Sequence, residues 1–156
     1  MKKVYEFIYI FFASLRKEKV ALKYLRKGAE AGNHECQNEL GVKLLNGDGC
    51  KKNQIEATKW FQKSAILGNR YAQANFAASH HEGIGVTQNF EEALLWYNKA
   101  INNGHNESAF NLGTLYENGY GVEKNLEEAK KYYKIAQAHG VAQANDALHE
   151  IETLQE

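Results

Sequence analysis

Apolar residues recur three and four positions apart along the chain, in short segments separated by glycine-containing turns. Leu40 and Leu44 show this spacing, as do Ala57, Trp60 and Phe61. It is the period of an amphipathic α-helix with one buried face. The chain also contains 13 glycines and no proline, which favours helices that end at glycine over a turn-rich β protein. The pattern therefore predicts an all-α protein.

The helical segments are copies of one unit, because the sequence aligns with itself at a shift of 36 residues, as helical repeat proteins do. Equivalent positions hold alanines (Ala21, Ala57, Ala93, Ala129), aromatic residues (Tyr24, Trp60, Trp96, Tyr132) and closing glycines (Gly32, Gly68, Gly104, Gly140). The register predicts a first helix of each unit, helix A, near 34–46, 70–82, 106–118 and 142–155. It predicts a second helix, helix B, near 17–31, 53–67, 89–103 and 125–139.

Three complete units occupy residues 34–69, 70–105 and 106–141, with a half-unit at 17–33 before them and a terminal helix at 142–156 after them. One pair of amphipathic helices cannot bury its own apolar face, so neighbouring units must stack along one axis. A chain of 156 residues suits a single domain. We therefore expect residues 17–156 to form one solenoid.

A glycine-rich turn joins helix A to helix B in each complete unit: NGDGCKKN at 46–53, EGIGVTQN at 82–89 and NGYGVEKN at 118–125. These turns are not phosphate-binding P-loops, because G-x-x-x-x-G-K-[ST] is absent and each turn follows a helix instead of a strand. Each turn ends in an asparagine that is followed three residues later by a glutamate, in the pairs Asn53/Glu56, Asn89/Glu92 and Asn125/Glu128. This spacing predicts N-caps of the capping-box type.

The L-G of helix A, the G-x-G-V turn, the A-x-x-W-[FY] of helix B and the closing glycine resemble the Sel-one-like repeat (SLR) family, relatives of the tetratricopeptide repeats. The resemblance covers about residues 17–156. It implies a right-handed α/α superhelical solenoid of helix-turn-helix repeats that serves as an adaptor or scaffold. The family alone does not name a partner.

Candidate catalytic and metal-binding patterns are weak. His80, His81 and Glu82 are consecutive, and neighbours on a helix point in different directions, so we expect no metal site there. Ser14-Leu15-Arg16-Lys17 matches S-x-x-K, and a cysteine-rich branch of the resembled family binds penicillin. The companion motifs S-D-N and K-T-G are missing, as are the regularly spaced cysteines of that branch. A β-lactam-binding enzyme is thus a remote alternative, and we expect a non-catalytic protein without a cofactor.

The first sixteen residues, MKKVYEFIYIFFASLR, are apolar from Val4 to Ala13 except for Glu6 and are too short to span a bilayer. Our preferred interpretation is a structural cap that supplies the missing first helix. A signal peptide and an interfacial anchor or partner contact are the alternatives. We favour a cytoplasmic location, with a periplasmic, exported or membrane-associated one as the alternative. Membrane contact would be restricted to residues 1–16.

Helix-A residues that point away from the core are expected to form a concave partner-binding surface, as in tetratricopeptide solenoids. They are Glu35, Asn38, Val42, Tyr71, Ala74, Ala78, His81, Glu107, Phe110, Thr114, Glu117 and Asp146. Carboxylates and aromatic rings on this surface favour a protein or peptide partner with basic and apolar groups. An acidic groove disfavours nucleic acid. We therefore predict a protein-binding adaptor, with an immunity-type inhibitor that occludes a toxin or effector as the alternative.

Overall fold

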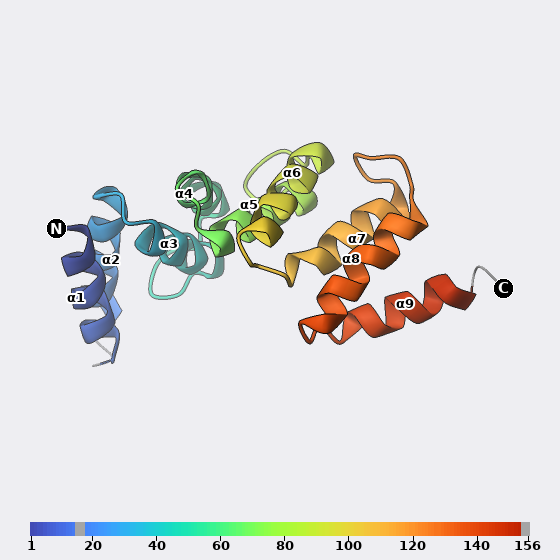
Figure 1. Ribbon diagram of the computed structural model, residues 1–156. Helices are drawn as coiled ribbons and strands as arrows, with labels where there is room; N and C mark the ends of the chain where they lie inside the picture. Colours follow the sequence, from blue (N-terminus) through green and yellow to red (C-terminus); the bar gives the residue numbers. More distant parts are fainter. Residues whose placement is uncertain (15–17, 154–156) are drawn as a thin grey trace.

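The computed structural model describes residues 1–14 and 18–153, and these residues form nine α-helices in a row of stacked pairs (Figure 1). The helices are α1 (Lys2–Ser14), α2 (Glu18–Glu30), α3 (His34–Asn46), α4 (Gln54–Ile66), α5 (Arg70–Glu82), α6 (Phe90–Asn102), α7 (Ser108–Asn118), α8 (Leu126–Ala138) and α9 (Gln143–Thr153). Each helix packs mainly against its neighbours in the chain, and the two termini lie at opposite ends of the row. The architecture is the expected right-handed α/α solenoid.

The predicted helices are confirmed, with α3 and α5 at their expected bounds and most other ends within a residue. The exception is α7, which begins at Ser108 instead of near residue 106. Asn33 and Asn69 cap α3 and α5 through their side chains, whereas His105 occupies the equivalent position before α7. Its Nδ1 lies 2.9 Å from the Ser108 hydroxyl, and no side chain caps the first turn of α7. Loss of the asparagine cap therefore explains the late start.

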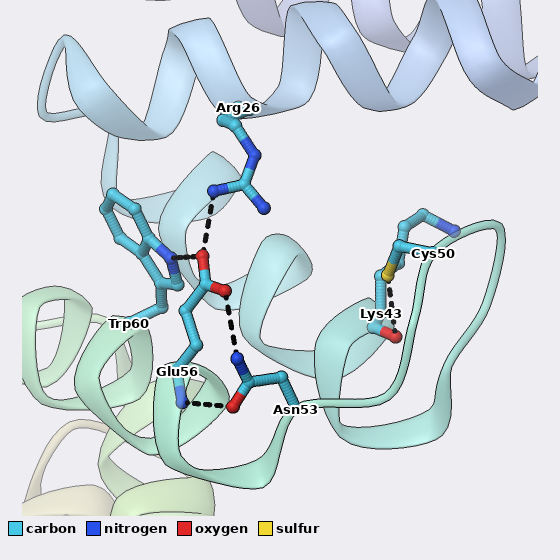
Figure 2. Close-up of polar contacts among 6 residues, drawn as sticks. All are labelled: Arg26, Lys43, Cys50, Asn53, Glu56 and Trp60. Carbon is cyan, nitrogen blue, oxygen red and sulfur yellow. Dashed lines mark hydrogen bonds and ion pairs between the residues drawn. The ribbon is translucent and has the colours of Figure 1, made fainter.

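The B-helix N-caps are confirmed, but the capping-box prediction for their glutamates is wrong. Asn53 Oδ1 accepts a hydrogen bond from the Glu56 backbone N–H at 3.1 Å (Figure 2). The backbone N–H of Asn53, which a capping-box glutamate would bind, already donates to the carbonyl of Leu44. The Glu56 carboxylate instead accepts from Trp60 Nε1 at 3.3 Å and from Arg26 Nη1 of the preceding helix B at 2.8 Å. The glutamate therefore joins two units.

Small residues bring the helices of a pair close together. A Cβ atom added to Gly41 would lie 2.5 Å from the Phe61 ring, and one added to Gly113 would lie 2.6 Å from the Tyr133 ring. Buried side chains form three apolar clusters along the row, and Trp96 packs against two of them. The core is therefore continuous between units, as stacking requires.

The second glycine of the turn contacts the preceding unit. Gly85 has φ of +68°, and a Cβ atom added to it would lie 2.2 Å from the backbone carbonyl oxygen of Gln54 at the start of α4. A Cβ atom added to Gly121 would lie 2.7 Å from Phe90 Cβ at the start of α6. A side chain at either position would collide with that helix in addition to straining the backbone. The recurring glycine turns thus serve the stacking of repeats.

Helix α1 packs against α2 and also contacts α3. The Phe12 and Tyr24 rings are stacked with their centroids 5.7 Å apart, and the Tyr9 hydroxyl donates to Glu39 Oε1 at 2.8 Å. Of the helices in residues 1–14 and 18–153, none is long and apolar enough to cross a membrane.

Candidate functional site

A hollow of about 330 Å³ lies between the A-type helices at the N-terminal half of the row. It brings together three of the predicted partner-binding residues: Glu35, Asn38 and Tyr71. Glu35 and Tyr71 are exposed, and half of the Tyr71 side-chain surface is accessible. The guanidinium of Arg70 already lies over the Tyr71 ring, 4.9 Å from its centroid. An aromatic ring beside a carboxylate is suited to hold such a cationic side chain.

Four further polar residues of the hollow were not among the predicted partner-binding residues: Glu6, Tyr9, Glu39 and Asn69. Glu6 accepts a hydrogen bond from Asn33 Nδ2 at 2.8 Å, and Glu39 accepts a hydrogen bond from the Tyr9 hydroxyl. Burial and the bond to Glu39 raise the pKa of Tyr9 well above its ordinary value. The tyrosine therefore remains a neutral donor. Among the described residues, the lining of the hollow contains three glutamates and neither lysine nor arginine, and Lys43 lies just outside it with Nζ 3.7 Å from Glu39 Oε1.

The wall of the hollow also contains the thiol of Cys36. Cys36 is almost fully buried, and this burial, together with nearby glutamates, raises the pKa of its thiol to about 12. A thiol with so high a pKa stays protonated and is a poor nucleophile at neutral pH. Cys36 therefore contributes apolar packing instead of covalent chemistry.

Further along the surface, several predicted residues are only partly exposed. Asn38 accepts a hydrogen bond from Asn75 Nδ2 of the next helix A at 3.0 Å. Val42 and Ala78 pack at the edges of apolar clusters, and Ala74 is half-buried. These residues form a continuous floor that links α3 to α5.

Four predicted residues make contacts within their own unit. His81 Nδ1 lies 3.5 Å from the Tyr97 hydroxyl, and Glu117 Oε2 accepts a hydrogen bond from the Tyr133 hydroxyl at 2.5 Å. Thr114 Oγ1 lies 3.4 Å from the same Tyr133 hydroxyl, and the Phe110 ring packs against the Tyr133 ring at 5.5 Å. This end of the predicted surface is therefore engaged in holding helix A to helix B.

Glu107 and Asp146, the remaining predicted residues, are exposed and lie outside the hollow. Glu107 lies 3.7 Å from His105, whose ring meets the edge of Tyr71. The Tyr71 hydroxyl in turn accepts a hydrogen bond from Arg70 at 2.9 Å. The structure thus connects Glu107 to the hollow through Tyr71, whereas Asp146 stands apart on α9.

The other candidate chemistries gain no support from geometry. Within the described ranges, no group of three or more His, Cys, Asp or Glu side chains is placed to hold a metal ion. His80 is buried against the Phe76 ring. The last three residues of the S-x-x-K match, 15–17, lie outside the described residues.

Stacked helix pairs with a shared core and a hollow on the helix-A side define a helical-repeat solenoid. The Sel1 repeat model matches residues 15–33, 34–69, 70–105 and 106–140. The chain therefore belongs to the Sel1 repeat family, whose members generally act as protein-interaction scaffolds and are typically non-catalytic. No protein of curated function matches the sequence.

Solved structures of Sel1 repeat proteins share the fold. One is c5321, a protective antigen present in uropathogenic Escherichia coli strains, with 31% identity and a TM-score of 0.80 over 84% of this chain and 28% of that protein. A Sel1 repeat protein from Oxalobacter formigenes has 34% identity and a TM-score of 0.79 over 84% of this chain and 54% of its own. Helicobacter pylori cysteine rich protein B, at 21% identity and a TM-score of 0.63, covers 83% of this chain and 93% of its own. The chain thus spans about a quarter and about half of the first two proteins.

Proposed function

We propose that the protein is a non-catalytic adaptor that binds a peptide or protein segment carrying basic and apolar groups. The hollow between α1, α3 and α5 carries this proposal, because it gathers Glu35, Glu39 and Tyr71 in one accessible place. A lysine or arginine of the partner would lie beside the carboxylates, against the part of the Tyr71 ring that Arg70 leaves exposed. The half-buried floor of α3 and α5 would take its apolar neighbours.

Pre-organisation explains how such a site gains affinity. The side chains of the hollow lie on packed helices, and several are already hydrogen-bonded, as Tyr9 is to Glu39 and Glu6 is to Asn33. Little side-chain ordering remains to be done when the partner binds. The partner's charge then selects it and accelerates its approach.

The proposal is tested by selecting peptides from a random library displayed on phage against the full chain. We expect enrichment of peptides that combine Lys or Arg with apolar residues. Glu35→Lys and Tyr71→Ala should weaken a selected peptide by roughly tenfold or more in fluorescence anisotropy, because each removes a central contact. Glu123→Lys and Leu95→Ala are the matched controls, since both residues are exposed away from the hollow.

Thermal unfolding of each variant separates binding from folding. Peptides without basic residues, or binding that survives both hollow variants, would contradict the proposal. Loss of binding only in parallel with loss of folding would also contradict it.

A further inference from the structure

Helix α1 occupies the position of a helix A, but at a different spacing from the repeat. It begins 32 residues before α3, whereas α3 begins 36 residues before α5. The difference arises in the connection to helix B, because three residues separate α1 from α2 and seven separate α3 from α4. Val4 and Phe7 of α1 therefore correspond to Cys36 and Glu39 of α3.

In α3, these two positions face the preceding unit. The Cys36 sulfur lies against Gly28 of α2, and Glu39 accepts the hydrogen bond from Tyr9 of α1. In α1, the corresponding Val4 and Phe7 are 56% and 70% exposed. Ile10, three residues after Phe7, is exposed as well. These three residues form the α1 outer face, an apolar stripe at helical spacing whose edge residue, Ile10, also lines the hollow beside Glu35.

The same open end continues onto α2. Val20 corresponds in the 36-residue register to Glu56, whose carboxylate contacts Arg26 of the preceding helix B. Val20 thus points in the same direction as the α1 outer face, and it is 37% exposed. The apolar surface at this end therefore spans two helices.

Charge around the α1 outer face is basic. Lys2, Lys3 and Lys19 are exposed, and Lys3 precedes Phe7 by one helical turn. Glu6 is the one acid of α1, and its carboxylate is turned toward α3, where it binds Asn33. Residues 1–52 as a whole carry eleven Lys or Arg against six acids. The stripe is thus bordered by Lys3 and Lys19, while Lys2 and Glu6 lie together on the side of α1 nearest Gly32 and Asn33.

We propose that the α1 outer face, with Lys3 and Lys19, is a docking surface for an anionic lipid bilayer. Val4, Phe7 and Ile10 would enter the boundary between headgroups and acyl chains, and the lysines would contact anionic headgroups. A head-to-head pair of two copies is disfavoured, because it would bring both sets of lysines together.

Co-sedimentation of the full chain with lipid vesicles tests the proposal. We expect binding to phosphatidylcholine–phosphatidylglycerol vesicles, with markedly weaker binding to pure phosphatidylcholine and at raised salt. Val4→Ser/Phe7→Ser should weaken binding by roughly tenfold or more, through lost apolar burial. Lys3→Gln/Lys19→Gln should weaken it by roughly twenty-five-fold, since each basic residue near an anionic surface is worth about fivefold.

Ile55→Ser/Leu95→Ser is the matched control, because it removes two equally exposed apolar side chains from B helices elsewhere, and it should bind as the parent does. Circular dichroism should show all variants folded, since the altered side chains are exposed. Undiminished binding by Val4→Ser/Phe7→Ser, or equal binding to neutral vesicles, would overturn the proposal. Absence of vesicle binding by the parent chain would also overturn it. A dimer in analytical ultracentrifugation that Val4→Ser/Phe7→Ser dissociates would then identify a second copy as the occupant of the surface.

Discussion

The two ends of the solenoid are built from the same type of helix and expose opposite kinds of surface. At the C-terminal end, α9 buries its large apolar residues Leu148 and Ile151 and exposes polar ones such as Asp146 and Glu150. At the N-terminal end, α1 exposes Val4, Phe7 and Ile10. The outward side of α9 is therefore polar, whereas the outward side of α1 is apolar.

The repeat pattern alone therefore does not determine whether the outward side of a helix at the end of the row is polar or apolar. α9 keeps one buried stripe and is otherwise polar. α1 has one face toward α2 and α3 and a second apolar face outside. Large exposed apolar patches often mark interaction sites, and this second face is the surface that we propose docks to a bilayer.

The largest effect should come from truncating the buried face of α9. Ile151 is fully buried, so Ile151→Ala should lower the free energy of unfolding by about 3 kcal/mol. The matched change in α1 is Ile8→Ala, which should cost only about 1 kcal/mol because Ile8 is half-buried. Urea denaturation followed by circular dichroism measures both. Equal losses would show that α1 is anchored as firmly as α9.

The sequence predicted the helices, their order and the turns well, because the repeat presents each signal several times. Asn53, Asn89 and Asn125 cap their helices as their spacing indicates. The role of Glu56 was less accessible. A capping box would require the Glu56 carboxylate to accept from the Asn53 backbone N–H, but this N–H donates to the Leu44 carbonyl. Residue spacing does not encode this contact between helix A and the end of the turn.

The candidate site was only partly predictable. Glu35, Asn38 and Tyr71 follow from helical spacing, but Glu6 and Tyr9 belong to a helix displaced by four residues from the repeat register. A shift of 32 residues, which aligns Ile8 and Phe12 with Leu40 and Leu44, would have located them.

Helical spacing also cannot say whether a neighbour engages an outward side chain. His81 and Glu117 face tyrosines sixteen residues later in the chain. The sequence contains a hint of this pairing, since the equivalent positions in the first complete unit hold two apolar residues, Leu45 and Phe61. Comparison of paired positions between units, and not of single positions, carries that information.

A smaller effect should follow from removing the α1 acid that faces inward. Glu6→Ala deletes the acceptor of the Asn33 side-chain N–H and should lower the free energy of unfolding by about 1 kcal/mol. Glu6→Gln retains an acceptor and should restore most of the loss. Glu30→Ala, at an exposed position of α2, is the control and should have little effect. If Glu6→Ala matched Glu30→Ala, the inward contact of Glu6 would not stabilise the N-terminal end.

The smallest effect lies between the ends, at His81 of α5. Burial lowers the pKa of His81 below its ordinary value of 6.5. In acid, the unfolded chain therefore takes up a proton at this residue before the folded chain does, and stability falls as pH drops through about 6.5. His81→Gln should flatten this part of the stability profile between about pH 5 and 7, relative to the parent chain. Hydrogen exchange resolved by helix should show the acid-induced opening in α5 and α6, with α1 and α9 as internal references. An acid response confined to the ends, or one unchanged by His81→Gln, would mean that groups other than this histidine set the pH dependence.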